Sequence, residues 1–282
     1  MRVDCAQPRL GLGSSQVEAT LTYIGAATVL LEVGGWRFLT DPVLDPPGGV
    51  YALEQGPIRG AAARRLRLRS RKLTGPAVAP ENLPPVHAVL LSHDQHFDNL
   101  DTAGRAFLPK AGRVLTTVSG AKRLGGNAVG LAPWQPVRVG EIRVTATPAQ
   151  HGPRIALPVV GEVTGFFLEW PSQRHGGLYV SGDTVWFAGL AEVARRFKVS
   201  AALLHVGAAR FRLTGRIRYT LDAEDAVKLA KRLEPRTLIP IHHEGWSHFS
   251  EGRTEVEQAF QKAGLEAKTL WLEPGVPTRL EV

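Results

Sequence analysis

Short apolar runs separated by turn residues dominate the first part of the chain. The β-rich runs at 19–24, 28–33 and 36–40 predict three strands, and Gly34-Gly35 lies where a hairpin turn belongs. Residues 86–91 are apolar except for His87, which is typical of a strand buried on both faces. Further strands are predicted at 113–117, 142–147, 165–170, 178–181, 201–206 and 237–241.

Helical spacing of apolar residues appears between the later strands. It predicts amphipathic helices at 187–197, 222–233 and 254–263, the second of them with Asp222 as its N-cap. Strands and helices therefore alternate in the second half, whereas the first half begins with hairpins. This order predicts an α/β protein in which helices cover sheets, and we treat residues 1–282 as a single domain.

Composition narrows the classes of protein. Hydrophobic residues make up 44% and charged residues 21%, as in ordinary globular proteins. Cys5 is the only cysteine, which excludes an intramolecular disulfide and a multi-cysteine zinc site. No apolar run approaches the length of a membrane span, and the first residues lack a secretory signal pattern, so we expect a cytoplasmic protein. The net charge of +8 favours anionic partners without identifying one.

Histidine and aspartate gather just after four of the predicted strands. The loop 93–101 holds two histidines and three aspartates, a poor composition for a core. The other three places are His151, Asp183 and the pair His242-His243. Loops at strand ends bring residues distant in sequence together at the edge of a sheet. Imidazole and carboxylate groups are ligands for zinc, manganese or iron, and two such metals about 3.5–4 Å apart can share a bridging carboxylate. By contrast, we interpret His87, His175 and His205 as structural.

This order of residues resembles the metallo-β-lactamase-fold hydrolases, in particular the branch with L-ascorbate-6-phosphate lactonase and N-acylphosphatidylethanolamine phospholipase D. The matching segments are 23–28, 40–42, 91–101, 148–152, 181–184 and 240–246. The resemblance implies an αββα sandwich of the metallo-β-lactamase type, with a site for one or two zinc ions at one edge. It also suggests that Asp41 orients a ligand histidine, although a turn-forming Asp-Pro is an equal alternative.

The chain departs from the family pattern in one loop. The family motif His-x-His-x-Asp-His corresponds here to residues 93–99, with either one residue inserted or Gln95 in the place of the second histidine. Asn99 stands where the family has a final histidine. We predict that His96 binds the metal and Gln95 does not. One metal position would then use His93, His96 and His151, and the other would use Asp98, Asp183 and His242 and be short of one ligand, with Asp183 able to bridge the two.

The hypothesis that follows is metal-dependent hydrolysis of an ester, lactone or phosphodiester bond in an anionic small molecule. Asp98 would orient the nucleophilic water or take its proton, and His243, or its neighbours Glu244 and His248, would protonate the leaving group. Arginine-rich segments at 59–72 and 210–218 are predicted to form the rim of the site. Two alternatives remain: a nuclease, and a non-enzymatic binding protein with a decayed metal site, which Gln95 and Asn99 suggest.

Overall fold

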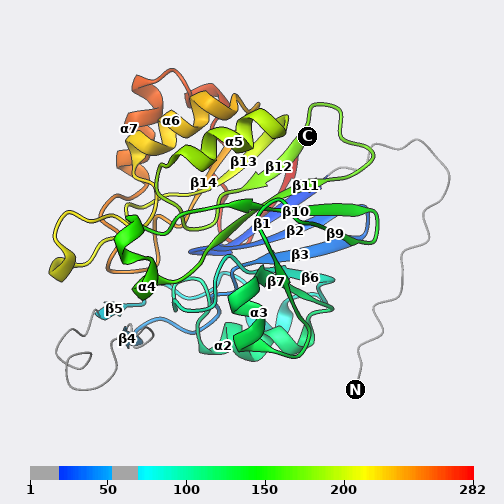
Figure 1. Ribbon diagram of the computed structural model, residues 1–282, viewed down its shortest axis with the longest axis horizontal. Coiled ribbons are helices and arrows are strands. Elements are labelled where there is room, and N and C mark those ends of the chain that lie inside the picture. The colour runs from blue at the N-terminus through cyan, green and yellow to red at the C-terminus, as the bar shows by residue number, and fades with distance from the viewer. Residues whose placement is uncertain (1–18, 53–68) are drawn as a thin grey trace.

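The computed structural model describes residues 19–52 and 69–282, and in it two β-sheets pack face to face with helices on both outer sides (Figure 1). From one side of the molecule to the other, the layers are helices α2 and α3, the first sheet, the second sheet, and helices α5 to α7 (Figure 1). The predicted αββα sandwich is therefore confirmed.

The first sheet has the strand order β15-β1-β2-β3-β6-β7-β8. Its strands are β1 (Ala19–Gly25), β2 (Thr28–Val33), β3 (Trp36–Thr40), β6 (Ala88–Leu90), β7 (Val114–Thr117), β8 (Ala128–Leu131) and β15 (Pro277–Leu280). The hairpins β1–β2 and β2–β3 are antiparallel, the second as Gly34-Gly35 predict, whereas β3, β6, β7 and β8 run parallel.

The second sheet has the order β14-β13-β12-β11-β10-β9. Its strands are β9 (Pro136–Val139), β10 (Ile142–Pro148), β11 (Thr164–Glu169), β12 (Gly177–Val180), β13 (Val199–His205) and β14 (Thr237–Ile241). Strands β12, β13 and β14 are parallel, and β10 has the same direction because it is two antiparallel steps from β12. A small hairpin of β4 (Val50–Ala52) and β5 (Arg69–Arg71) stands apart from both sheets.

Three apolar layers hold the sandwich together. One fills the space between the sheets, another lies between the second sheet and helices α5 (Ala188–Arg196), α6 (Ala223–Leu233) and α7 (Arg253–Lys262), and a third lies under α2 (Thr102–Phe107) and α3 (Val118–Leu124). The three predicted helices are present within a residue or two of their expected ends, and Asp222 is the N-cap of α6, where its side chain accepts from Asp225 N.

The short helices α2, α3 and α4 (Leu157–Val160) were not predicted from the sequence, nor were strands β4, β5, β8, β9 and β15. Each of them has seven residues or fewer, too short for a periodic pattern to show. Of the arginine-rich segment 59–72, residues 59–68 lie outside the described part of the chain. Across the residues that the structure describes, no helix is both long and apolar enough to cross a bilayer.

Strand direction places six loops at one edge of the sandwich. Strands β3 and β6 of the first sheet, and β10, β12, β13 and β14 of the second, all end there. The residues that follow these strands include Asp41, His93, His151, Asp183 and His242. Ligand types from both sheets therefore converge at this edge, as the sequence pattern predicts.

Candidate metal centre

Three imidazoles converge on one point. His93 Nε2 lies 2.9 Å from His96 Nδ1, and His151 Nε2 lies 2.8 Å from the same atom. All three side chains are buried. Zinc bonds nitrogen at about 2.0–2.1 Å, so two nitrogens bound to one tetrahedral zinc are about 3.4 Å apart. The three nitrogens lie within 4.8 Å of one another, and the two distances above are slightly shorter than the tetrahedral separation, so a small outward movement of the rings would admit a metal ion. We call this group the histidine triad.

Hydrogen bonds on the far side of two rings fix this arrangement. His93 Nδ1 lies 2.9 Å from Ser92 Oγ, and His151 Nδ1 lies 2.6 Å from the carbonyl oxygen of Tyr219. The carbonyl can only accept, so His151 carries its proton on Nδ1 and leaves Nε2 as a free lone pair. Such outer partners set the tautomer and the ring orientation of metal-binding histidines.

A second group, which we call the aspartate triad, consists of Asp98, Asp183 and His242. His242 Nδ1 lies 3.4 Å from Asp183 Oδ1, and His242 Nε2 lies 3.6 Å from Asp98 Oδ2. Neither pair forms a hydrogen bond, and two ligands of a tetrahedral zinc are about 3.4 Å apart. The spacing therefore fits a shared cation better than direct contact.

Unpartnered buried atoms support the same conclusion. Both ring nitrogens of His242 and both carboxylate oxygens of Asp183 are buried without a partner of good hydrogen-bond geometry among the described residues, and of these residues only the Asn99 amide is close enough to Asp183 to oppose the rise of its pKa. A buried polar atom without a partner is costly, and such groups call for an ion or another ligand. Three imidazoles in one triad, and one imidazole with two carboxylates in the other, are donor sets that fit a borderline metal such as zinc.

The pKa values suit metal binding. Burial, followed by the charge of neighbouring His151, lowers the pKa of His96 to about 3. Burial likewise lowers the pKa of His93, His151 and His242. Neutral imidazole is the form that binds a metal, so these side chains are ready to do so at neutral pH.

The two carboxyl groups of the aspartate triad behave differently from each other. Burial, reinforced by the charges of Asp98 and Asp41, raises the pKa of Asp183 well above its usual range. Burial would also raise the pKa of Asp98, but the neighbouring His248, His242 and His96 hold it well below its usual range. Without a cation, Asp183 is therefore the unfavourable charge of this site.

Strained backbone is concentrated at this edge. Among non-glycine residues with positive φ in the described chain, His242 (61°), Asp41 (26°), Ala26 (49°) and Ala208 (47°) all lie there. His242 N donates to Ala26 O at 2.9 Å, so two of these strained residues are hydrogen-bonded to each other. Residues in such conformations persist only where the surroundings enforce them, and they cluster at functional sites.

The loop 93–99 shows how the extra residue is accommodated. His96 joins the histidine triad, while the Gln95 amide lies against Gly161, where an added Cβ would come within 1.9 Å of Gln95 Nε2. Asp94 points away as well, toward the Arg123 guanidinium at 2.5 Å. The geometry agrees with our choice of His96 over Gln95, while metal binding itself stays a prediction. Asn99 is fully buried, and its Nδ2 donates to Ser92 Oγ at 3.4 Å.

The structure does not bring His243 into either triad. Its ring packs edge-on against Trp271, with ring centres 5.3 Å apart, because His243 faces the helical side of β14. Glu244 is exposed. His248 is the member of this group that reaches the site, since its Nε2 lies 2.9 Å from Asp98 Oδ2. Its spacing from the strand end gave no signal that would have singled it out.

Asp41 supports the site in a different way from the one expected. Its Oδ1 accepts from the backbone N–H of Ser92 at 2.7 Å, and its Oδ2 lies 3.2 Å from His205 Nε2. It thus holds the backbone beside His93 rather than the ring of a ligand. His205 also lies 3.3 Å from Ser181 Oγ, and His87 Nδ1 accepts from the backbone of Arg37, which agrees with structural roles for both histidines.

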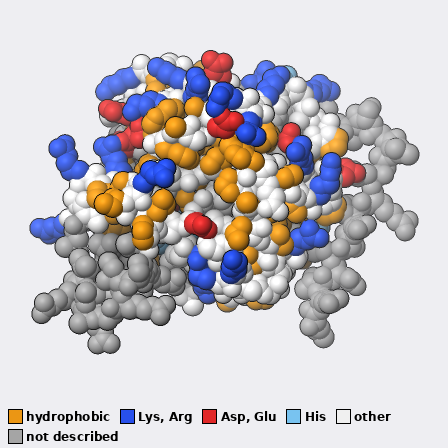
Figure 2. Space-filling model, viewed as in Figure 1, with side chains coloured by type: hydrophobic (Ala, Val, Ile, Leu, Met, Phe, Trp, Pro, Cys, Tyr) orange, Lys and Arg blue, Asp and Glu red, His pale blue; other side chains and the backbone are white. Residues whose placement is uncertain are grey.

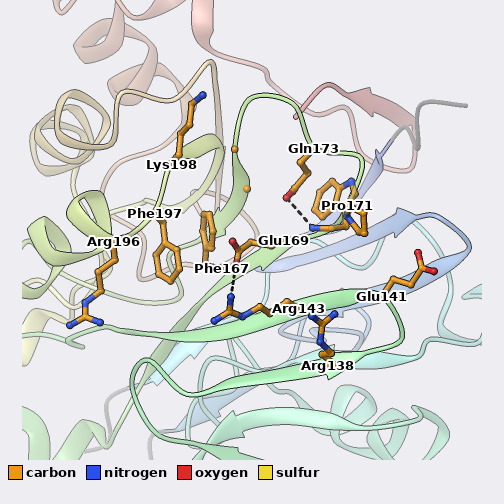
Figure 3. A pocket seen from close by; sticks show the side chains of 13 residues that line it. Arg138, Glu141, Arg143, Phe167, Glu169, Pro171, Gln173, Arg196, Phe197 and Lys198 are labelled. Atoms are coloured by element: carbon orange, nitrogen blue, oxygen red, sulfur yellow. Dashed lines mark hydrogen bonds and ion pairs between the residues drawn. The ribbon is translucent and has the colours of Figure 1, made fainter. Parts of the chain in front are cut away.

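One hollow of about 360 Å³ lies away from both triads (Figure 3). It is lined by residues at the amino ends of β10, β12 and β13, among them Arg143, Gly177 and Lys198. This is the edge opposite to the one that carries the triads. Figure 3 shows the Phe167 and Phe197 rings side by side in it and Arg143 reaching toward Glu169. No residue of either triad lines this hollow, so it is not a candidate for the metal site.

Comparison with known proteins agrees with this site. The Beta-lactamase superfamily domain matches residues 36–243. A UPF0173 metal-dependent hydrolase of Nanoarchaeum equitans is 24% identical over 75% of this chain and 94% of its own. Among solved structures, the isothiocyanate hydrolase from Delia radicum gut bacteria has a TM-score of 0.75 at 25% identity, covering 93% of this chain and 99% of that one. A possible metal-dependent hydrolase from Veillonella parvula also has a TM-score of 0.75, at 20% identity over 94% and 100% of the two chains.

Fold, ligand geometry and family match together define a metallo-β-lactamase-fold hydrolase. The chain belongs to the beta-lactamase superfamily, and its relatives of similar length are named metal-dependent hydrolases.

Proposed function

We propose that this protein is a zinc hydrolase in which His93, His96 and His151 would hold one ion and Asp98, Asp183 and His242 would hold a second. The observation that carries the proposal is the convergence of two buried ligand groups from both sheets, one of which has buried oxygens and nitrogens without other partners. When bound, zinc lowers the pKa of a coordinated water toward neutrality and polarises the oxygen of the scissile bond. Manganese or iron would suit the same ligands.

The side chains have separate tasks in this proposal. Asp98 stays ionised, because its pKa is held so low, and it orients the attacking water as a hydrogen-bond acceptor rather than storing the proton. His248, and not His243, is the histidine of this loop that contacts Asp98. His151 and His93, fixed by Tyr219 and Ser92, hold their neutral lone pairs toward the same point.

An anionic ester, lactone or phosphodiester remains the proposed substrate class, as in the lactonase and phospholipase branch. The support is the loop that carries Arg210, Arg212 and Arg216, which lies beside the site: Arg210 N donates to His248 O, and Tyr219 O contacts His151. Arg212 and Arg216 are exposed, so they can meet an anionic group. On the face shown in Figure 2, Lys and Arg side chains are spread widely rather than gathered in a stripe, which gives the nuclease alternative no support.

A neutral, apolar substrate is the second candidate. Aromatic rings lie directly against two histidines of the site: Phe211 stacks on His248 with ring centres 5.0 Å apart, and Phe249 packs on the proposed ligand His242 at 4.6 Å. Both phenylalanines are half-buried, so part of each ring faces outward. A structural neighbour is an isothiocyanate hydrolase, and an isothiocyanate is an uncharged electrophile. Water attack at such a carbon would use the same site.

The experiment combines metal analysis with a substrate panel. Protein purified without chelators is assayed for zinc, manganese and iron and then tested on generic esters, lactones, phosphodiesters and aryl or alkyl isothiocyanates, with and without prior metal removal. We expect bound metal and a metal-dependent turnover of at least one class. A chain that binds no metal and turns over nothing would instead be the decayed-site binding protein. Turnover of nucleic acid with steep salt dependence would favour the nuclease.

A further inference from the structure

Asp98 has an imidazole neighbour that the family motif does not provide. His248 Nε2 lies 2.9 Å from Asp98 Oδ2, and both side chains are buried. His248 is 150 residues away in sequence, in the loop after β14. In the same loop as Asp98, position 99 holds an asparagine where the family has histidine, and its amide turns toward Ser92. The buried imidazole next to Asp98 therefore comes from the other sheet.

The other side of the His248 ring is fixed too. His248 Nδ1 lies 2.6 Å from Ser70 Oγ. A carboxylate accepts hydrogen bonds, so Nε2 carries the proton toward Asp98, and Nδ1 accepts from the serine hydroxyl. Both ring nitrogens are then engaged, which leaves His248 no lone pair for a metal ion.

The segment that carries Ser70 is tied to the segment that carries His248. Ser247 N donates to Arg71 O at 3.0 Å, Arg71 N donates to Ser247 Oγ at 2.9 Å, and Lys72 forms a β-bridge with Trp246. Beneath them, Lys72 Nζ makes a buried ion pair with Asp101 at 2.6 Å. These backbone contacts fix the segments of Ser70 and His248 relative to each other, and with them the hydrogen-bonded series Ser70, His248 and Asp98.

We propose that His248 is a positioning residue that, locked by Ser70, fixes the Asp98 carboxylate for the metal ion of the aspartate triad. Carboxylates that bind metals are themselves held by hydrogen bonds, and loss of such a partner typically lowers metal affinity about 10–100-fold. Only the aspartate triad should depend on His248, because the histidine triad has its own outer partners, Ser92 and Tyr219. This inference rests on the proposed two-zinc site.

The test is zinc titration of the full chain against a competing chelator, which measures the affinity for the first and second equivalents separately. His248→Phe keeps a ring to stack on Phe211 but has no donor, whereas His248→Gln keeps an N–H that can reach Asp98. We expect His248→Phe to weaken the second equivalent about 10–100-fold, with the first unchanged, and His248→Gln to restore most of the loss. Ser70→Ala should give a smaller loss, again confined to the second equivalent. The control is His87→Gln, at a histidine far from the site that bonds the backbone of Arg37.

The outcomes separate the two proposals. If the wild-type chain binds no zinc, the proposed function fails. If it binds two equivalents and His248→Phe binds both as tightly, only the role of His248 is overturned. Equal losses in the Phe and Gln variants also overturn it, because they would show that the imidazole itself, and not its N–H, is needed. Circular dichroism checks that each variant is folded; if His248→Phe is not, the titration of Ser70→Ala decides, and an unchanged second equivalent there overturns the proposal.

Discussion

The two triads differ in how far the protein alone assembles them. In the histidine triad, the ligand nitrogens already lie 2.8–2.9 Å apart, and two of the rings are held from behind by Ser92 and Tyr219. In the aspartate triad, the corresponding separations are 3.4–3.6 Å, and Asp183 and His242 have buried atoms without hydrogen-bond partners. The first is preorganised for a metal, whereas the second carries an electrostatic cost that a cation would remove.

Because of this difference, the two triads should contribute differently to the affinity for metal and to the stability of the fold. Neutral imidazoles cost little to bury together, so the histidine triad can stand without an ion. A buried carboxylate without partners is expensive, and its raised pKa expresses that cost. We therefore expect the histidine triad to determine whether metal is bound and the aspartate triad to determine how much the metal stabilises the fold.

The largest expected effect follows removal of one ring of the histidine triad. His151→Ala leaves two ligands of three, so we expect it to lower zinc affinity at this position more than 100-fold, beyond the range typical of outer partners. Metal-dependent turnover should fall with it, while circular dichroism stays unchanged. Zinc content after dialysis measures the effect, and His87→Ala is the matched control. Wild-type zinc content in His151→Ala would contradict the assignment.

Loss of a ligand from the aspartate triad should change the stability of the metal-free protein as well as its response to zinc. Asp183→Asn removes the unfavourable buried charge but keeps the shape, so the metal-free protein should become more stable by about 1–3 kcal/mol. At the same time, added zinc should stabilise the variant less than it stabilises the wild type, because a ligand has been lost. Thermal unfolding with and without zinc tests both parts. A metal-free variant that is less stable than the wild type would show that Asp183 is satisfied without a cation.

The stability of the metal-free protein should fall as the pH drops from about 7 to 5. Because burial lowers the pKa of His93, His96, His151 and His242, the unfolded chain binds protons in this range that the folded chain does not. Each such histidine contributes up to about 1.4 kcal/mol per pH unit below its unfolded pKa of about 6.5. Asp183 opposes this trend because its pKa is raised, and Asp98 matters only at lower pH.

Urea unfolding at several pH values measures this slope. The His151→Ala variant should have a shallower slope than the wild type, since one of the contributing histidines is gone. The Asp183→Asn variant lacks the opposing carboxyl group, so constant stability of this variant without metal between pH 7 and 5 would mean that the buried histidines bind protons as readily in the folded state as in the unfolded one.

The smallest effect concerns the exposed arginines of the loop beside the site. Replacing Arg212 and Arg216 together with Gln should raise KM for an anionic ester about two- to fivefold, with no change for a neutral one, and should reduce the dependence of kcat/KM on salt. Steady-state kinetics at two ionic strengths provides the comparison. If both substrates respond equally, these arginines only face solvent, and the neutral-substrate candidate gains support.

The sequence predicts much of this site because its ligands follow long, apolar strands. His93, His151, Asp183 and His242 each come just after a strand whose composition marks it, and parallel direction brings those ends together. The resemblance to a known family supplied the sandwich itself.

What could not be predicted depends on contacts between distant segments. His248 and Ser70 meet across 178 residues, through a short hairpin of three-residue strands that no periodic pattern reveals. For the same reason His243 was preferred: adjacency to His242 in sequence says nothing about which side of β14 the next residue faces, and in the structure it faces Trp271. The orientation of Gln95 and His96 likewise needed the loop in three dimensions.

The most direct test of the two-triad account is an anomalous diffraction map at the zinc edge from crystals of the full chain grown with zinc. The account predicts one peak bonded to His93 Nε2, His96 Nδ1 and His151 Nε2, and a second peak among Asp98, Asp183 and His242. Gln95 should lie outside both coordination spheres. A map with no peak at the histidine triad, or with Gln95 in place of His96, would contradict it.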